Sequence, residues 1–289
     1  MLGAGGFIGR ALSARLAARG TATHALTRGD TGTLSADSDW SRWLDGAEIV
    51  IHAATSASPR HELGRFAREI AAAEALGRTA ARCGIRRVVL MSSIRAMGEE
   101  SDSTPFRADA IPEPTDDYGR AKLAIEHAMA GAPGLTILRP PLVYGPEVGG
   151  GLRAFLVAIA KGLPLPFASI RNRRAFIFMD NLIDAVERLL GPEVPAGTYL
   201  LRDDEEISTP ELVRRIARQM NRAPRLLPCP TGLLRAGLSL AGRSDIAMTL
   251  IGSLAIDDTA TRARLGWRPR ASLDEGLAAT CRWFREAAR

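Results

Sequence analysis

The sequence predicts an α/β fold, with a doubly wound parallel sheet followed by a smaller mixed α/β lobe. Three observations predict it. The chain opens with a glycine-rich turn, GAGGFIG, and apolar runs of strand length then alternate with helical patterns as far as Tyr144. Beyond Tyr144 the segments become mixed, and proline-rich links separate them. We expect residues 1–144 to form the sheet domain and residues 145–289 the lobe, with a segment near 170–190 returning to the sheet domain.

Each element is predicted from its hydrophobic period and from the turn residues that bound it. STPE, at Ser208 to Glu211, is a capping box whose hydroxyl and carboxylate satisfy free amide donors at a helix start. In the lobe we expect helices near 152–161, 181–190, 209–221 and 273–285. In the sheet domain we expect helices at 7–19, 62–83 and 118–130, and strands at 23–27, 47–55, 86–93 and 135–141.

Composition limits the class of protein. The 289 residues are 46% hydrophobic, with no apolar run long enough to span a membrane and no leader segment, so we expect a cytoplasmic protein. The net charge of +6 could indicate nucleic acid, but the arginines are scattered through helices rather than clustered, which favours an anionic small substrate. Cys83, Cys229 and Cys281 lack metal-site spacing, and we expect them to be reduced and buried, with no metal bound.

The glycine-rich turn has the spacing of a dinucleotide-binding loop. Gly3 would make the tight turn, Gly6 would let the backbone approach a pyrophosphate, and Gly9 would let the helix pack against the sheet. The amino end of that helix offers free N–H groups and a positive dipole. The signal is weak by itself, because 28 glycines make such spacings common, and an ordinary glycine-rich turn is the alternative.

A stronger signal is YGRAK, in which Tyr118 and Lys122 share one helix face at positions i and i+4. An ammonium near a phenol favours the phenolate, so we expect the pKa of Tyr118 to fall toward neutral pH and the pair to act as acid and base. The alternative is an exposed helix pair. In this chain such a pair would use arginine, because Lys122 and Lys161 are its only lysines.

In the motif MSSIRAMG, the hydroxyl groups of Ser92 and Ser93 stand at the end of the strand expected at 86–93. Open α/β sheets bind ligands at the carboxyl edge, where this strand ends. Ser93 could therefore hydrogen-bond the same substrate oxygen that Tyr118 protonates. A turn serine that caps a loop is the alternative.

The motifs GAGGFIG, IHAAT, MSSIRAMG, YGRAK and RPPLVYGP resemble those of the extended short-chain dehydrogenase/reductase family, which has a Rossmann fold. Within it the chain resembles the NAD-dependent epimerase/dehydratase branch, in particular its nucleotide-sugar 4-epimerases and UDP-N-acetylquinovosamine 4-dehydrogenases. The resemblance spans nearly the whole chain and implies a nucleotide-sugar substrate. It also implies a homodimer, through a four-helix bundle made by the helices at 62–83 and 118–130; the alternative is that these helices cover only their own sheet.

Matched position by position, the resemblance implies Ser93, Tyr118 and Lys122 as catalytic residues. Ser93 and Tyr118 would also contact substrate, and Arg174 would hold its diphosphate. The expected cofactor-binding residues are Gly3, Gly6, Phe7, Ile8, Gly9, Arg28, Ala53, Ala54, Thr55, Ser92, Tyr118, Lys122, Pro140 and Val143.

The sequence departs from the family pattern in several places, among them the acidic residue replaced near Thr33 and Leu34 and the Asn missing at Gly149 to Gly151. Only Met1 and Leu2 precede the glycine turn, so the first strand is truncated, and we expect the native protein to begin upstream. Where NAD-preferring members end the second strand with Asp, this chain has Thr27 and Arg28. An arginine there suits the 2′-phosphate of NADP or stacks on the adenine of NAD, so the cofactor is NAD or NADP.

The implied reaction is hydride transfer at C4 of a UDP-linked hexose or N-acetylhexosamine, by a 4-epimerase or a 4-ketoreductase. Two alternatives are a non-catalytic NADP-binding regulatory protein of the same fold and a reductase of a non-nucleotide ketone. TGLLRAGLSLAG, at Thr231 to Gly242, is amphipathic enough to touch a membrane surface, but we expect a core helix of the lobe there.

Overall fold

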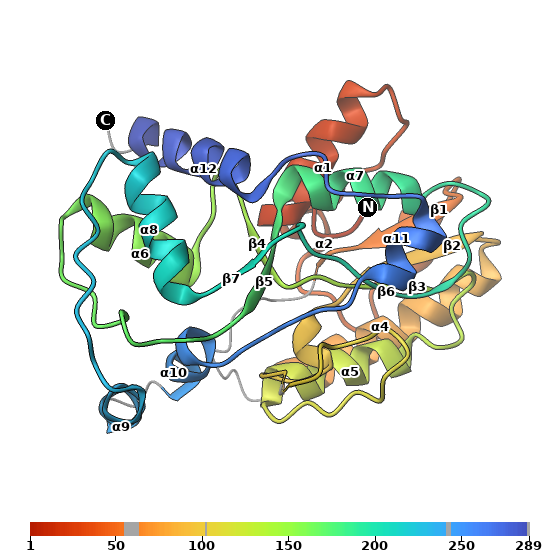
Figure 1. Cartoon of the computed structure of the whole chain (residues 1–289). Helices are drawn as coiled ribbons and strands as arrows, with labels where there is room; N and C mark the ends of the chain where they lie inside the picture. The colour runs from red at the N-terminus through yellow and green to blue at the C-terminus, as the bar shows by residue number, and fades with distance from the viewer. Residues whose placement is uncertain (55–63, 102, 241–243, 288–289) are drawn as a thin grey trace.

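The computed structural model describes residues 1–54, 64–101, 103–240 and 244–287. Two sheets organise the chain: a parallel sheet clad by helices on both faces, and a smaller mixed sheet in the second half (Figure 1). This is the α/β architecture that the sequence predicts, and its Rossmann-type sheet is confirmed.

The parallel sheet has the order β1-β2-β3-β6, and most residues of these strands are buried. Apolar, β-branched runs such as IVIH and RVVLM form these strands because both of their faces are covered by helices. The strand β6 follows a helix of the second half and was not foreseen. The bounds are β1 Ile49–His52, β2 Arg87–Met91, β3 Thr136–Arg139 and β6 Gly197–Leu200.

Beyond β1 the sheet continues through single residues. Leu2 forms parallel bridges with both His52 and Leu26. Its N–H donates to the Ile51 carbonyl at 2.8 Å, and its own carbonyl accepts from Ala53 N–H at 3.0 Å. Leu2 thus occupies the central position expected for the first strand. The expected strand at 23–27 is wrong, because only Leu26 pairs.

Helices cover both faces of the sheet (Figure 1). On one face α1 (Phe7–Ala18) packs against α7 (Met179–Leu189), and on the other α4 (Arg65–Arg82) packs against α5 (Asp117–Ala128). Each pair encloses its own apolar core. The short helices α2 (Arg28–Thr31), α3 (Trp40–Leu44) and α11 (Thr259–Leu265) lie around the sheet, together with η1 (Ile94–Ala96).

The second sheet has the order β4-β5-β7, and one large apolar core joins it to its helices. The predicted cap of α8 is confirmed, because the Ser208 hydroxyl accepts from Glu211 N–H. The bounds are β4 Leu142–Tyr144, β5 Arg174–Phe178, β7 Glu206–Ile207, α6 Gly150–Ala160, α8 Thr209–Gln219 and α12 Leu273–Ala287.

Two expectations about burial are wrong. The helix α9 (Thr231–Leu240) has no buried residue, so it is not a core helix, and it packs against α10 (Ser244–Ile251). Of the three reduced cysteines only Cys281 is buried, whereas Cys83 is exposed and Cys229 partly exposed. Cys83 caps the end of α4, where solvent reaches it.

Candidate active site

The glycine turn is closely packed and requires glycine at two positions. A Cβ on Gly3, whose φ is +84°, would lie 2.6 Å from the carbonyl carbon of Ala53. A Cβ on Gly9 would lie 2.0 Å from the carbonyl oxygen of Gly3. The turn therefore holds α1 directly against the end of β1, with Ala53 and Ala54 beneath it.

The start of α1 fits a pyrophosphate group. Gly6 is the N-cap residue, and no side chain caps the helix there. Phe7, Ile8 and Gly9 form its first turn, where backbone N–H groups have no partner within the helix. An anion is the natural partner of such an end. Thr55, expected beside it, lies outside the residues that the structure describes.

Ser93, Tyr118 and Lys122 come together at the carboxyl edge of the sheet. Ser93 caps η1 by accepting from Arg95 N–H at 3.2 Å. Gly119 explains the approach of α5 to η1, since a Cβ there would lie 2.3 Å from the Arg95 carbonyl oxygen. The Tyr118 side chain hydrogen-bonds Ser93, and Lys122 Nζ lies 5.5 Å from the centre of the Tyr118 ring.

The pKa of Tyr118 is raised above its ordinary value by burial, which disfavours the phenolate. The hydrogen bond with Ser93 and the positive charge of Arg95 oppose this effect without reversing it. The expected fall of this pKa toward neutral pH is therefore wrong for this structure. Loss of hydration outweighs the surrounding positive charges.

Lys122 is buried, and its burial lowers its pKa to about 8, while Glu69 and Glu126 oppose the shift. It therefore still carries a proton at neutral pH. His52, at the end of β1, is also buried, and burial and the charge of Lys122 lower its pKa to about 4. Among the described residues His52 Nδ1 has no hydrogen-bond partner, so the imidazole is held neutral.

Sequence reasoning missed the carboxylate beneath this cluster. Glu126 is buried and accepts hydrogen bonds from the Ser92 hydroxyl and from the Arg139 guanidinium, whose Nε lies 3.0 Å from it. The Ser92 hydroxyl thus points into the α5 side of the sheet. Glu126 stands four residues after Lys122, on the helix face that already carries Tyr118, and that spacing could have revealed it.

Arg174 and Arg95 place two guanidinium groups near the cluster. Arg174 is only 8% exposed, and its Nη1 donates to the Gly252 carbonyl at 2.8 Å. Burial, with the positive charge of Arg95, lowers the pKa of Arg174 to about 10. Arg95 is paired with Asp116, the N-cap of α5, at 2.9 Å. Mutual repulsion between two guanidinium groups is relieved by an anion between them.

The remaining expected cofactor residues lie in two places. Pro140 is buried after β3, where its carbonyl accepts from Ile94 N–H, and Val143 lies in β4. Arg28 is exposed at the start of α2, with Nη2 3.3 Å from the Thr33 hydroxyl. Two positions on, Asp30 accepts from the Thr27 amide and hydroxyl, at 2.8 and 2.6 Å. The segment after Leu26 thus carries an anion beside its cation.

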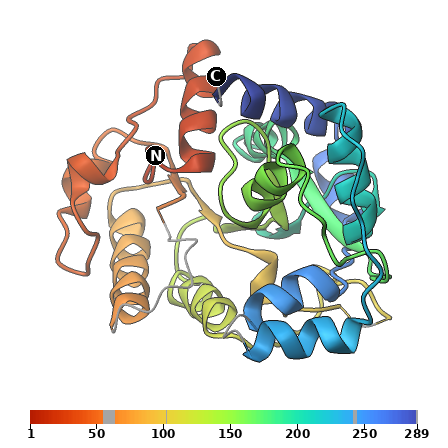
Figure 2. The same ribbon diagram turned by 90° about the vertical axis from the view of Figure 1, so that its left-hand side faces the viewer.

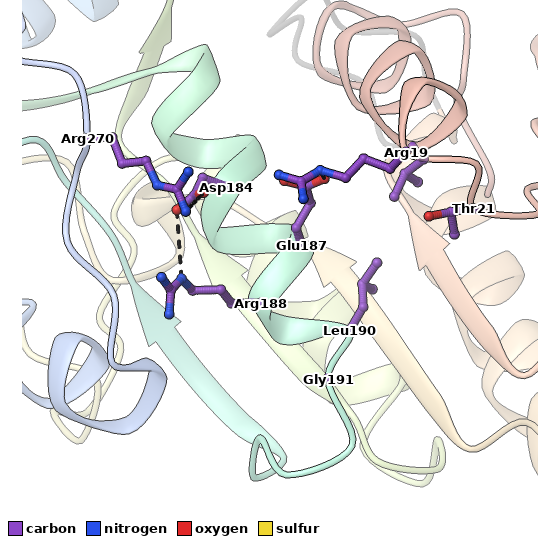
Figure 3. A pocket seen from close by; sticks show the side chains of 9 residues that line it. Arg19, Thr21, Asp184, Glu187, Arg188, Leu190, Gly191 and Arg270 are labelled. Carbon is purple, nitrogen blue, oxygen red and sulfur yellow. Dashed lines mark ion pairs between the residues drawn. The ribbon is translucent and has the colours of Figure 1, made fainter.

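A cavity of about 480 Å³ lies apart from these residues, between α1, α7 and the segment after α11 (Figure 3). It lies at the far end of α1 from the glycine turn. Its carboxylates are paired, Glu187 with Arg19 at 2.9 Å and Asp184 with Arg270 at 3.0 Å. None of the described residues that the sequence singled out lines it, so the carboxyl edge remains the candidate site.

Comparisons with known proteins show the family of the chain. The model of the NAD dependent epimerase/dehydratase family matches residues 1–199. A UDP-glucose 4-epimerase of Vibrio cholerae is 30% identical, over 99% of this chain and 95% of its own. A ceramide reductase of Caulobacter vibrioides is 31% identical, over 86% of this chain and 78% of its own.

Solved structures share the fold. The complex of a protein named MoeE5 with UDP-glucose and NAD superposes with a TM-score of 0.79, at 22% identity, over 100% of this chain and 98% of that one. The Rossmann-type sheet and the lobe are therefore found together in both proteins.

Proposed function

Because the chain belongs to the NAD dependent epimerase/dehydratase family, we propose that it is a 4-epimerase of a UDP-linked hexose or N-acetylhexosamine. It is an NAD-dependent enzyme of the short-chain dehydrogenase/reductase type. The observation that carries the proposal is the grouping of Ser93, Tyr118 and Lys122 at the sheet edge where the uncapped helix α1 begins. We propose these three as the catalytic residues.

The proposed mechanism uses Tyr118 as both base and acid. NAD held at this edge would supply the hydride acceptor and donor for the sugar carbon. Tyr118, as phenolate, would take the hydroxyl proton during oxidation and give it back during reduction. Lys122, protonated below about pH 8, stabilises that phenolate, and the Ser93 hydroxyl orients the sugar oxygen. Burial raises the pKa of Tyr118, so at rest the residue is in the acid form that the reductive step uses, and the oxidative step requires that it first lose this proton.

Return of the hydride to the other face of the ketone would complete an epimerisation. This requires the sugar ring to turn while the nucleotide end stays bound. We propose that Arg174, with Arg95 near it, holds the diphosphate. Binding the anion would relieve the repulsion between the two guanidinium groups, so the diphosphate would anchor the substrate while its ring turns.

The dinucleotide would lie with its pyrophosphate on the glycine turn and α1, and with its adenosine near Arg28. The Asp30 carboxylate, two residues from Arg28, would oppose the 2′-phosphate of NADP. The family favours NAD. We therefore propose NAD, and direct titration with NAD and NADP tests the choice: tighter binding of NADP would contradict it.

Replacing Tyr118 tests the proposed chemistry. Tyr118→Phe keeps the ring but removes the transferable proton, so kcat with UDP-glucose or UDP-N-acetylglucosamine should fall about 100-fold or more. Binding of NAD, measured by titration, should change little. Tyr199→Phe is the matched control, because its hydroxyl donates to the Pro195 carbonyl, just before β6 and away from the cluster. Unchanged turnover in Tyr118→Phe would favour a non-catalytic, regulatory protein.

A ketoreductase is the second candidate. The exposed Arg28 supports it, since a reductase exchanges its cofactor in each turnover and often uses NADP. The two are separated by incubating the protein with UDP-sugars and no added cofactor. Formation of the 4-epimer supports the epimerase. Turnover only after addition of NADPH and a 4-keto sugar supports the reductase.

A further inference from the structure

The helix α9 exposes an apolar stripe. Leu233 is 68% exposed and Leu240 is 91% exposed. With Ala236 and Gly237 they stand at the spacing i, i+3, i+4, i+7, which places all four on one helix face. A different face of α9, carrying Leu234, packs toward the core of the lobe. The stripe therefore remains in solvent after the helix has docked on its own chain.

Most of the exposed large apolar side chains among the described residues lie on or next to this helix. The segment before α9 pairs with the segment after α6 through a bridge between Leu226 and Leu165, and two further exposed leucines stand on these segments. Four of the five exposed large apolar side chains found in the described residues thus belong to one group. We call Leu163, Leu227, Leu233, Ala236, Gly237 and Leu240, with the arginines described next, the α9 surface.

The same region is strongly basic, so the arginines are not evenly scattered as the sequence first indicated. Residues 212–244 contain seven arginines and no Asp or Glu. Those in the middle of α8, Arg214 and Arg215, are paired with carboxylates. The other described arginines of this stretch are exposed and form no ion pair with any described residue. These are Arg218, Arg222, Arg225 and Arg235.

We propose that the α9 surface docks the protein on an anionic lipid bilayer. An interfacial helix combines an apolar stripe, which enters the boundary between headgroups and acyl chains, with basic residues that bind anionic headgroups. Figures 1 and 2 place α9 at the outer edge of the molecule in both views, where a flat surface can reach it. Among the described residues no helix is long and apolar enough to cross a membrane, so this attachment is peripheral.

Charge favours a membrane over a second copy of the chain. A twofold contact through this surface would bring its unpaired arginines against their own copies. The stripe has only two large apolar side chains on a ten-residue helix. The area that it could bury is therefore small compared with the roughly 800 Å² that each partner buries in a stable complex. An anionic bilayer complements both the charge and the small apolar area.

The surface is attached firmly to the lobe. The carbonyls at the end of α10 accept hydrogen bonds from β5 and from the segment before it: Asn172 Nδ2 donates to Leu250 at 3.0 Å, and Arg174 Nη1 donates to Gly252 at 2.8 Å. Since α9 packs along α10, docking would fix the orientation of the lobe that carries Arg174. The proposal does not depend on which sugar the enzyme uses.

Vesicle flotation of the full chain tests the proposal. The protein should float with phosphatidylcholine vesicles containing about one-third phosphatidylglycerol, should not float with phosphatidylcholine alone, and should be released by salt near 1 M. Leu233→Ser with Leu240→Ser should weaken binding about tenfold or more. Arg222→Ala, Arg225→Ala and Arg235→Ala should each weaken it about fivefold.

Ile111→Ser is the matched control, because Ile111 is 82% exposed but stands in the loop before α5. It should float as the wild type does. The altered side chains are exposed, so the fold and the basal turnover should be unchanged, which circular dichroism and an assay check. Absence of flotation with the anionic vesicles at low salt would overturn the proposal. A change of molar mass in the leucine variant, with flotation unaltered, would also overturn it and indicate a contact between copies.

Discussion

The helices α5 and α9 differ in where their charged side chains lie and in whether those side chains are paired. Beneath α5, Glu126 and Arg139 are both buried and bonded to each other, with Ser92 and Lys122 beside them. Around α9 the arginines stand in solvent without carboxylate partners among the described residues. A buried charge has a fixed partner and a fixed position, whereas exposed charges act as a group that salt screens. The first suits chemistry at one atom, and the second suits adhesion to a surface.

The largest expected effect comes from breaking the buried pair. Glu126→Gln leaves the Arg139 guanidinium buried without its counter-charge, so the free energy of unfolding should fall by about 3 to 5 kcal/mol, measured by urea denaturation. Glu74→Gln is the control, since Glu74 pairs with Arg78 on the exposed side of α4 and should cost less than about 0.5 kcal/mol. Equal losses in the two variants would show that burial does not determine how much the Glu126–Arg139 pair contributes to the free energy of unfolding.

The glycine turn should tolerate change almost as poorly. In Gly9→Ala the new methyl group would lie 2.0 Å from the Gly3 carbonyl oxygen, so α1 must move away from the turn. We expect a loss of about 3 kcal/mol of unfolding free energy, the upper end for overpacking, together with weakened NAD binding in a titration. Wild-type affinity for NAD in this variant would mean that the close approach of α1 to Gly3 is not needed for the cofactor.

His52 should make stability depend on pH. Its pKa is about 4 in the folded chain and 6.5 in the unfolded chain. Between these values the unfolded state binds a proton that the folded state does not, so the free energy of unfolding falls as pH falls from 6.5 toward 4. From pH 7 to pH 5 the loss should be about 2 kcal/mol. His52→Asn should remove that part of the pH dependence in urea titrations, and parallel curves for both proteins would contradict it.

The sequence predicted the parallel sheet well because strands such as RVVLM are apolar on both faces and helices such as Phe7–Ala18 carry clear periods and end signals. It missed β6, whose four residues GTYL stand after a helix of the second half and carry too short a pattern. It also mistook α9 for core, because its leucines occupy two faces and the pattern does not say which one the chain covers.

For the candidate site, spacing was sufficient to group Tyr118 with Lys122, since helix geometry fixes which side chains share a face. Ser93 joins them through a close contact between η1 and α5 that needs Gly119. The pKa of Tyr118 could not be predicted, because it depends on how much water the fold removes rather than on the neighbouring residue in the sequence. Glu126 follows the same spacing, but its burial appears only in three dimensions.

The smallest expected effect sharpens the contrast between the two regions. Gly237 lies in the stripe of α9, and a Cβ added there meets no atom within 4 Å. Gly237→Ala should therefore raise the free energy of unfolding by up to about 1 kcal/mol, because alanine favours the helix and nothing has to move. The same substitution thus has opposite signs at Gly9 and Gly237, and thermal or urea denaturation measures both. A destabilised Gly237→Ala would mean that the outer face of α9 is already covered by its own chain, which would remove the surface that the bilayer needs.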